Sequence, residues 1–401
     1  MRLFHCGHCG FLVFFESFQC VHCGSTLAFV REHVDVVALQ PASEGGDLWE
    51  RRLPRPGLGV THENTSNAGV SESEEPYLRY RMCANRTRYQ VCNFALINTP
   101  QTPHDALCPA CRQTRLLPDL SEPLNVRRWG QIEAAKRRLF YIDVRLGLVH
   151  LPGEVGPIFE FLADLPGSMP VLTGHASGLI TLNIAEADDD ERVRRRVAFH
   201  EPYRTLLGHL RHEIGHYFWD VLIARGTGHR LEEFRTLFGD ERHDYGQALQ
   251  DYYARTPVPD HLWQNTHVSA YATAHPWEDW AETWAHYLHL VDLLETAKSF
   301  DTQINVPSPL GDQHFTTIDP FLMPPPPFES MLSALVPTTL LLNSLTRSLG
   351  QIDAYPFALS AQAQKKMRFV HEVVSERRVA RAAQMTSSMH GNTQNLPVSD
   401  T

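Results

Sequence analysis

The stretch Gly208-His-Leu-Arg-His-Glu-Ile-Gly-His-Tyr217 contains His212-Glu213-Ile214-Gly215-His216, which matches the pattern H-E-x-x-H. Residues four apart lie on the same face of a helix, so both imidazoles can reach one metal ion while Glu213 projects beside it. This arrangement is typical of zinc hydrolases, in which the glutamate handles a metal-bound water. We therefore predict that His212 and His216 bind zinc and that Glu213 is the general base.

The residues around this motif have helical spacing. Apolar side chains recur at intervals of three and four through residues 203–223, and Pro202 suits a first helical turn. The apolar positions are Leu206, Leu207, Leu210, Ile214, Phe218, Val221 and Leu222. The alternative interpretation is an amphipathic core helix whose histidines only bond to neighbouring groups.

Composition limits the class of protein. The chain has 401 residues, of which 43% are hydrophobic, so it can bury a sizeable core. Its formal net charge of -10 argues against a generally basic nucleic-acid-binding surface. The apolar run of residues 11–15 is too short for a signal peptide and residues 331–345 fall short of a membrane span, so we expect a cytoplasmic protein with reduced thiols.

All eight cysteines precede residue 112 and form two groups of four. The first group consists of two C-x-x-C-G turns, Cys6, Cys9, Cys20 and Cys23, separated by a short apolar stretch. A glycine after each pair lets the backbone turn under a metal, and four thiolates complete a tetrahedral site. This pattern predicts a structural zinc ribbon; the alternative is redox-active or incidental cysteines.

The second group consists of Cys83, Cys92, Cys108 and Cys111. Only Cys108 and Cys111 have the spacing of a zinc knuckle, whereas Cys83 and Cys92 stand farther apart. We predict a second structural zinc site here, with free thiols as the alternative. A zinc deaminase also carries a C-x-x-C pair, but it requires an upstream His-x-Glu that this sequence does not offer.

The sequence divides into five segments. Residues 1–39 are expected to form the zinc ribbon, and residues 40–76, rich in Gly, Pro, Ser, Asn and Glu, a linker or mobile loop. Residues 77–120 would hold the second cysteine site and residues 121–383 the catalytic domain. Residues 384–401 are expected to be a disordered tail.

The part that leads into the motif predicts a helix and a strand. Residues 120–146 have the pattern of an amphipathic helix with a basic outer face, which we interpret as solvated. Residues 179–185 alternate as in a β-strand, and the acidic residues of 186–191 suit a helix N-terminus. The strand is either an ordinary interior strand or an edge that pairs with an extended substrate.

A catalytic zinc usually has a third protein ligand, and several residues are candidates. The metzincin continuation fails, because Trp219 and Leu222 stand where it requires Gly and His. Residues 275–289 form an acidic, helix-compatible segment in which residues four apart could share one face. The candidate groups in it are Glu278, Glu282 and His286, and rivals elsewhere are Asp220 and His243.

These motifs together carry a family resemblance. The run Glu278-Asp-Trp-Ala-Glu-Thr-Trp284 after an H-E-x-x-H resembles the third-ligand helix of gluzincins. With the stretches Thr173-Gly-His-Ala-Ser-Gly-Leu-Ile-Thr-Leu-Asn183, Glu201-Pro-Tyr-Arg-Thr-Leu-Leu207 and Phe238-Gly-Asp-Glu-Arg242, the chain resembles the bacterial zinc-binding metallopeptidase family with an N-terminal zinc ribbon. The resemblance covers about residues 1–300 and extends as far as His371 at most.

The resemblance implies roles for further residues. Glu282 would be the third zinc ligand, with Asp279 or Glu278 behind it to orient a ligand histidine. Tyr271, eleven residues before Glu282, stands where some gluzincins place a tyrosine that stabilises the oxyanion; a core aromatic is the alternative.

The expected fold is α+β, with zinc-ribbon modules followed by a mainly helical, zincin-like domain with a small sheet. The expected function is zinc-dependent hydrolysis of peptide bonds through a zinc-activated water, with Glu213 as general base. One catalytic and up to two structural zinc ions are implied. We expect a peptide or protein substrate, a protein partner at the ribbons, and neither a membrane nor nucleic acid. The alternative is a ribbon-based partner-binding protein with an inactive or latent zincin-like domain.

Overall fold

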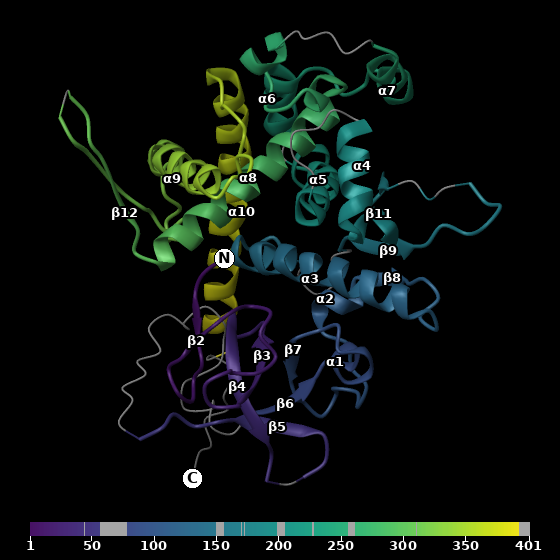
Figure 1. Ribbon diagram of the computed structural model, residues 1–401, viewed down its shortest axis with the longest axis vertical. Coiled ribbons are helices and arrows are strands. Elements are labelled where there is room, and N and C mark those ends of the chain that lie inside the picture. The colour runs from purple at the N-terminus through teal and green to yellow at the C-terminus, as the bar shows by residue number, and fades with distance from the viewer. Residues whose placement is uncertain are drawn as a thin grey trace. The chain divides into compact units, whose positions relative to one another are not determined.

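The computed structural model of the protein describes residues 1–43, 45–56, 78–149, 156–169, 171, 173–198, 205–226, 228–255, 261–309 and 311–392. The chain divides into two compact units, which we describe separately (Figure 1). Unit 1 comprises Met1–Tyr141, Val155–Tyr217 and Lys298–Asp301, and unit 2 comprises Ile142–Glu154, Phe218–Ala297 and Thr302–Thr401. Three helices contribute residues to both units, namely α3 (Pro123–Arg145), α5 (Leu206–Trp219) and α8 (Pro276–Ser299).

Unit 1 begins with a small hairpin of β1 (Phe4–His5) and β2 (Leu12–Val13), which carries the first cysteine pair between its strands. Gly10 and Gly24, which follow the two cysteine pairs, both have a φ of 72°. Because L side chains rarely adopt this conformation, glycine is the residue that allows both turns. The prediction that these glycines turn the backbone under each cysteine pair is confirmed.

A closed five-stranded barrel follows the hairpin (Figure 1). Its strands are β3 (Thr26–Val30), β4 (Asp35–Pro41), β5 (Leu48–Arg51), β6 (Arg79–Met82) and β7 (Phe94–Ile97). Consecutive strands pair antiparallel, and β7 closes the barrel by pairing parallel with β3, Phe29 opposite Phe94. The buried interior contains the side chains of Ala28, Val30, Val37, Leu39, Tyr80, Met82 and Ala95.

The barrel corrects one expectation about the segment 40–76. Residues 48–51 form the barrel strand β5 rather than a linker, because Trp49 packs against the barrel core and the strand pairs with both neighbours. Residues 57–77, to which most of the expected linker belongs, lie outside the described residues.

Unit 1 also contains a mixed sheet of four strands, with the order β10-β11-β9-β8. The strands are β8 (Thr114–Leu116), β9 (Ile158–Leu162), β10 (Gly174–Ala176) and β11 (Leu179–Asn183). The predicted strand at residues 179–185 thus corresponds to β11, which has β9 as a parallel and β10 as an antiparallel neighbour. It is an interior strand, and β10 is the edge beside it.

Two helices of unit 1, α3 and α4 (Asp189–Ala198), adjoin this sheet in space or in sequence. The predicted amphipathic helix is α3, whose Lys136 lies over the rings of Phe159 and Phe161 on β9. Buried Glu133 accepts a hydrogen bond from the Lys136 ammonium at 2.8 Å, so this part of the helix is internal rather than solvated. A 3-10 turn at Ile184–Ala187 leads into α4, which has acidic residues in its first turn as predicted.

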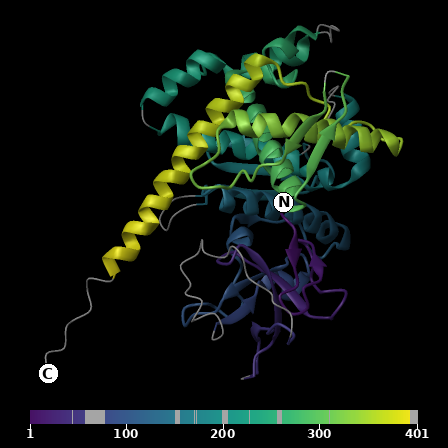
Figure 2. The same ribbon diagram turned by 90° about the vertical axis from the view of Figure 1, so that its left-hand side faces the viewer.

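Unit 2 is built around aromatic side chains of α6 (Gly228–Phe238), α8 and α10 (Ala361–Asn392). Trp280 of α8 contacts the rings of Phe234 and Phe238 from α6 and of Phe369 from α10. Trp280 is fully buried, so these contacts tie the three helices together by apolar burial. Figure 2 shows α10 as one long helix.

The remaining elements of unit 2 are shorter, apart from α9 (Phe328–Ser348). A π-helical turn, Asp220–Ala224, continues α5, and α7 (Tyr245–Ala254) follows α6. Two 3-10 turns, His261–Asn265 and Tyr271–Thr273, precede α8, and a hairpin of β12 (Gln303–Val306) and β13 (Gln313–Thr316) follows it.

The final helix corrects the predicted start of the tail. Helix α10 continues through Asn392 instead of ending at residue 383, because residues such as Ala382, Ala383 and Gln384 favour helix. The last residues, 393–401, lie outside the described part of the chain. Among the helices of the described residues, none is long and apolar enough to span a membrane.

Candidate metal centres

The first cysteine quartet brings four sulfur atoms together at the base of the ribbon. The Sγ atoms of Cys6 and Cys23 are 3.6 Å apart, as are those of Cys9 and Cys20. Sulfur ligands about 2.3 Å from a tetrahedral zinc are about 3.8 Å from one another. The quartet therefore has the size of a four-thiolate zinc site, and all four cysteines are free of disulfides.

The second quartet also converges. Cys83 and Cys92 flank α1 (Ala84–Tyr89), Cys108 caps α2 (Pro109–Arg112), and Cys111 lies within α2. The Cys92 and Cys108 sulfurs are 3.8 Å apart, and all four residues are buried free cysteines. Burial raises the pKa of the Cys108 thiol well above its usual value, so its thiolate requires a cation beside it. Four buried sulfurs at this spacing fit zinc.

The H-E-x-x-H motif lies within α5, as predicted. Leu210, Ile214 and Phe218 are buried along this helix, while His212 and His216 are partly exposed on another face. The ring centroids of the two histidines are 5.0 Å apart. One helical turn therefore presents both imidazoles together.

A carboxylate from α8 completes a group of three possible ligands. Ligand atoms of His212, His216 and Glu278 all lie within 4.8 Å of one another. Two imidazoles and one carboxylate are the donor set of many catalytic zinc sites, and they leave a fourth position for water or substrate. The chemistry of the donor set therefore fits zinc.

The structure brings Glu278, and not the expected Glu282, into the group with the two histidines. Glu282 lies one turn beyond Glu278, and its Oε2 accepts a hydrogen bond from the Ser269 hydroxyl at 2.6 Å. Both glutamates lie on the same helix at a spacing that shares a face, so the sequence spacing alone could not distinguish them. In the described residues, the group around the histidines includes Glu278 and leaves out Glu282.

Comparisons with known proteins identify a peptidase family and a zinc-ribbon domain. The sequence model of a family described as "Putative zinc-binding metallo-peptidase" matches residues 125–373, and that of a zinc-ribbon domain matches residues 3–122. The chain belongs to this metallopeptidase family. The family resemblance predicted from the sequence is confirmed, and so is the order of an N-terminal zinc-ribbon domain and a peptidase domain.

Relatives of this metallopeptidase family member occur in mycobacteria. Proteins of Mycobacterium bovis and Mycobacterium tuberculosis, each named as uncharacterized, are 36% identical over 380 residues. The alignments cover 94% of this chain and 96% of each relative. No solved structure matches the chain.

The acidic residue next to Glu278 has a different environment from the one the family resemblance implied. Asp279 is buried, and its Oδ2 accepts a hydrogen bond from the Lys366 ammonium at 2.5 Å and lies 3.6 Å from Nε2 of His267. Burial raises the pKa of Asp279 to about 7, although Lys366 acts in the opposite direction. These contacts involve neither His212 nor His216. They link α8 to α10 instead.

The other candidate residues from the sequence, Tyr271, His286, His243 and Asp220, lie outside the group of three possible ligands. Tyr271 is in a 3-10 turn, and burial raises its pKa far above the usual value, with the charge of Glu278 acting in the same direction. His286 Nδ1 is 2.8 Å from the Tyr355 hydroxyl. The carbonyl oxygen of His243 is 3.2 Å from Nε2 of His275. Asp220 begins the π-helical turn after α5.

One residue beside the site had been assigned no role from the sequence. His175 on the edge strand β10 stacks on His216, with ring centroids 5.7 Å apart and an interplanar angle of 17°. The backbone N–H of Gly178 donates to His175 Nε2 at 3.0 Å. Burial, and then His216, lowers the pKa of His175 to about 4, so the ring is neutral. Its only sequence signal was membership of the motif 173–183, which does not indicate contact with α5.

Proposed function

We propose that this protein is a zinc-dependent peptidase in which His212, His216 and Glu278 hold the metal. The observation that supports this most is the convergence of the two histidines of the H-E-x-x-H with a carboxylate from a second helix. Zinc bound there would polarise the scissile carbonyl and acidify a water molecule. A zincin-like, gluzincin-type fold belongs to the same proposal.

The chain's own groups supply proton transfer. Glu213 follows His212 directly on α5, and the group of three possible ligands leaves it out. In the proposed mechanism, Glu213 accepts a proton from the attacking water and returns it to the leaving amine. Tyr271, whose pKa responds to the charge of Glu278, would donate a hydrogen bond to the oxygen on which negative charge develops.

The two cysteine sites have a structural role in this proposal. Four thiolates fill the coordination sphere of zinc and leave no open position for chemistry. The substrate would be a peptide or protein, and the ribbons would contact a protein partner. A cytoplasmic location stays a prediction.

The test compares wild-type protein with Glu213→Gln in a screen of a complex peptide mixture, with cleaved products identified by mass spectrometry. The variant should keep its zinc and lose cleavage by about 10² to 10⁴-fold, the contribution of a general base. Zinc content, measured on the same samples, separates loss of the metal from loss of the base. No cleavage by either protein would favour the binding-protein alternative, whereas equal cleavage by both would show that Glu213 is not the general base.

A further inference from the structure

A tyrosine hydroxyl contacts the proposed third ligand directly. The Tyr245 hydroxyl donates a hydrogen bond to Glu278 Oε1 at 2.5 Å. A carboxylate has two oxygens, so Glu278 can accept this bond with one and turn the other toward a metal ion. A donor at a fixed position also selects among the side-chain rotamers of the glutamate.

The Tyr245 ring is itself held in place. It packs edge-on against His275, with centroids 5.2 Å apart, and at a tilted angle against Trp277, with centroids 5.6 Å apart. The Trp277 backbone N–H donates to His275 Nδ1 at 3.1 Å, so the proton is on Nε2, which donates to the His243 carbonyl at 3.2 Å. His275 and Trp277, at the start of α8, therefore contact the Tyr245 ring, and His275 also bonds to the backbone of His243.

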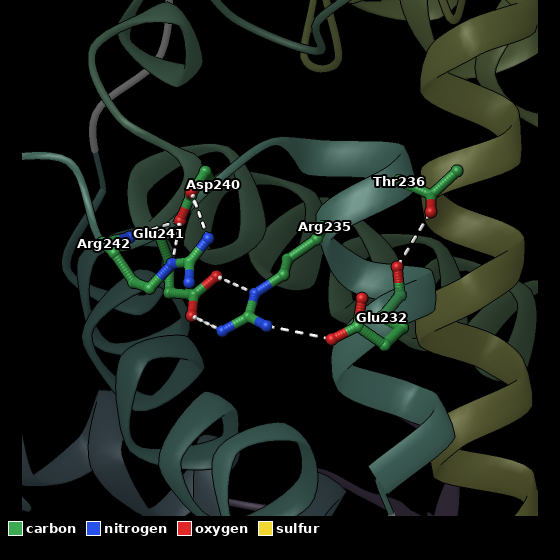
Figure 3. A network of polar contacts seen from close by, with 6 residues as sticks. All are labelled: Glu232, Arg235, Thr236, Asp240, Glu241 and Arg242. Carbon is green, nitrogen blue, oxygen red and sulfur yellow. Dashed lines mark hydrogen bonds and ion pairs between the residues drawn. The ribbon is translucent and has the colours of Figure 1, made fainter.

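The loop between α6 and α7 is fixed from its other side by ion pairs (Figure 3). Arg235 on α6 donates two hydrogen bonds to the buried carboxylate of Glu241, at 2.6 and 3.0 Å. Arg242 makes a similar two-bond contact with Asp240, at 2.7 and 2.8 Å. These residues belong to the motif Phe238-Gly-Asp-Glu-Arg242, which the proposed catalytic chemistry does not use.

The loop leads directly to the tyrosine. Asp244 caps α7 by accepting a hydrogen bond from the Gln247 backbone N–H at 2.9 Å, and Tyr245 is the first residue of that helix. The ion pairs and the cap leave the chain little freedom between α6 and Tyr245. The ion pairs and the cap of this loop therefore help to fix the position of the Tyr245 hydroxyl.

We propose that Tyr245 is a positioning residue for the metal site, which holds Glu278 in the orientation that binds zinc, and that the Phe238–Arg242 loop acts through it. This inference rests on the proposed function, because it requires Glu278 to be a zinc ligand. Groups that hydrogen-bond a metal ligand typically contribute 10 to 100-fold to metal affinity.

The experiment measures zinc affinity of the full chain in a titration with chelator-buffered free zinc. A variant that lacks both His212 and His216 defines the zinc bound by the cysteine sites, which is subtracted. Tyr245→Phe removes only the hydroxyl and should raise the free zinc at half-occupancy by about 10 to 100-fold. The melting temperature of Tyr245→Phe without catalytic zinc should match that of the control variant Tyr355→Phe.

The matched control is Tyr355→Phe. It removes a tyrosine hydroxyl that contacts another α8 side chain, His286, outside the group of three ligands. Zinc affinity should stay within twofold of wild type. Equal weakening by both variants would mean that general loosening of α8 is responsible, and would overturn the inference.

Two further variants distinguish the inference from the proposed function. If Glu278→Ala binds zinc as tightly as wild type, the third-ligand assignment fails and the role of Tyr245 fails with it. If Glu278→Ala loses the metal but Tyr245→Phe does not weaken it, only the role of Tyr245 is wrong. Glu241→Gln should weaken zinc in the wild-type background and add nothing to Tyr245→Phe, because coupled residues are not additive. Full additivity would overturn the role of the loop.

Discussion

Glu278 and Glu282 lie one turn apart on α8, yet their carboxylates contact different hydroxyls, those of Tyr245 and Ser269. We expect Glu278→Ala to lose the catalytic zinc at a free-zinc concentration that saturates the wild type, because two imidazoles alone leave the site a ligand short. Glu282→Ala should keep this zinc. Zinc per chain, measured by elemental analysis after equilibration with buffered zinc, checks both expectations.

Asp220→Ala is the control for this comparison, because Asp220 lies just beyond α5 and was a rival ligand in the sequence. It should also keep the zinc. Loss of metal from Glu282→Ala with retention in Glu278→Ala would restore Glu282 as the third ligand.

The site was only partly predictable from sequence. His212, Glu213 and His216 follow from spacing within one helix, which is a local rule. The choice of Glu278 depends on which face of α8 meets the histidines, and α8 is buried on nearly all sides, including at Glu278, Trp280 and Trp284. A helix that is buried all round carries no periodic signal of its faces. His175 depends on tertiary contact between a hairpin and α5, which no local pattern records.

A second residue-scale prediction concerns acid stability. His371 is buried, its Nε2 donates to the Pro326 carbonyl at 2.9 Å, and its Nδ1 lies 3.1 Å from the Tyr287 hydroxyl. Burial lowers the pKa of His371, as does Arg378, while Glu329 and the Pro326 bond act in the opposite direction. The folded state therefore binds the proton less readily than the unfolded state.

The lowered pKa of His371 makes the folded protein less stable at acid pH. His371 costs no stability above the ordinary histidine pKa near 6.5, and the free energy of unfolding falls as the pH drops from there toward the lowered folded value. His371→Gln, which cannot titrate, should lose less stability over this range, by up to about 1.4 kcal/mol per pH unit. Urea unfolding at several pH values measures this difference. Parallel pH curves for the two proteins would contradict it.

At the scale of elements, Gly239 joins α6 to the loop that leads to α7. Its φ is +107°, and a Cβ added there would lie 3.3 Å from Cγ of Pro276, the first residue of α8. We expect Gly239→Ala to destabilise the protein by about 1 to 3 kcal/mol through backbone strain, with a further cost of about 1 kcal/mol from the contact with Pro276. The free energy of unfolding in urea measures the loss.

Gly311→Ala is the matched control, because Gly311 has a φ of +114° and open space where its Cβ would lie. Gly311→Ala should lose stability through backbone strain alone, without the contact that Gly239→Ala makes with Pro276. If the two variants lose equal stability, the contact with Pro276 does not constrain α8.

Elements with strong periodicity were predictable, and those that depend on distant pairing were not. The helices α3 and α5 and the strand β11 match segments whose apolar pattern was clear. Strand β5 was missed because it lies in a polar stretch and exists through pairing with β4 and β6 rather than through its own composition. The barrel was missed for the same reason.

At the scale of the whole molecule, the donor sets imply up to about three zinc ions per chain. Cys6→Ser with Cys9→Ser should remove one, and Cys83→Ser with Cys108→Ser should remove another. Because metal binding at such sites contributes to folding, each pair should also lower the melting temperature. Elemental analysis and thiol titration check this. A protein that purifies with one zinc or none and with reactive thiols would contradict the prediction of two structural zinc sites.

The closed barrel has a consequence for association with other chains. A sheet closed on itself exposes no row of unpaired backbone groups, so its strands cannot recruit a strand from another molecule. That protection exists only after β7 has paired with β3, a contact between segments distant in sequence, and pairings of this kind form slowly. Cys92 lies two residues before the closing pair at Phe94. A newly made chain that lacks zinc therefore keeps open strand edges for longest, and we expect aggregation to begin from that species.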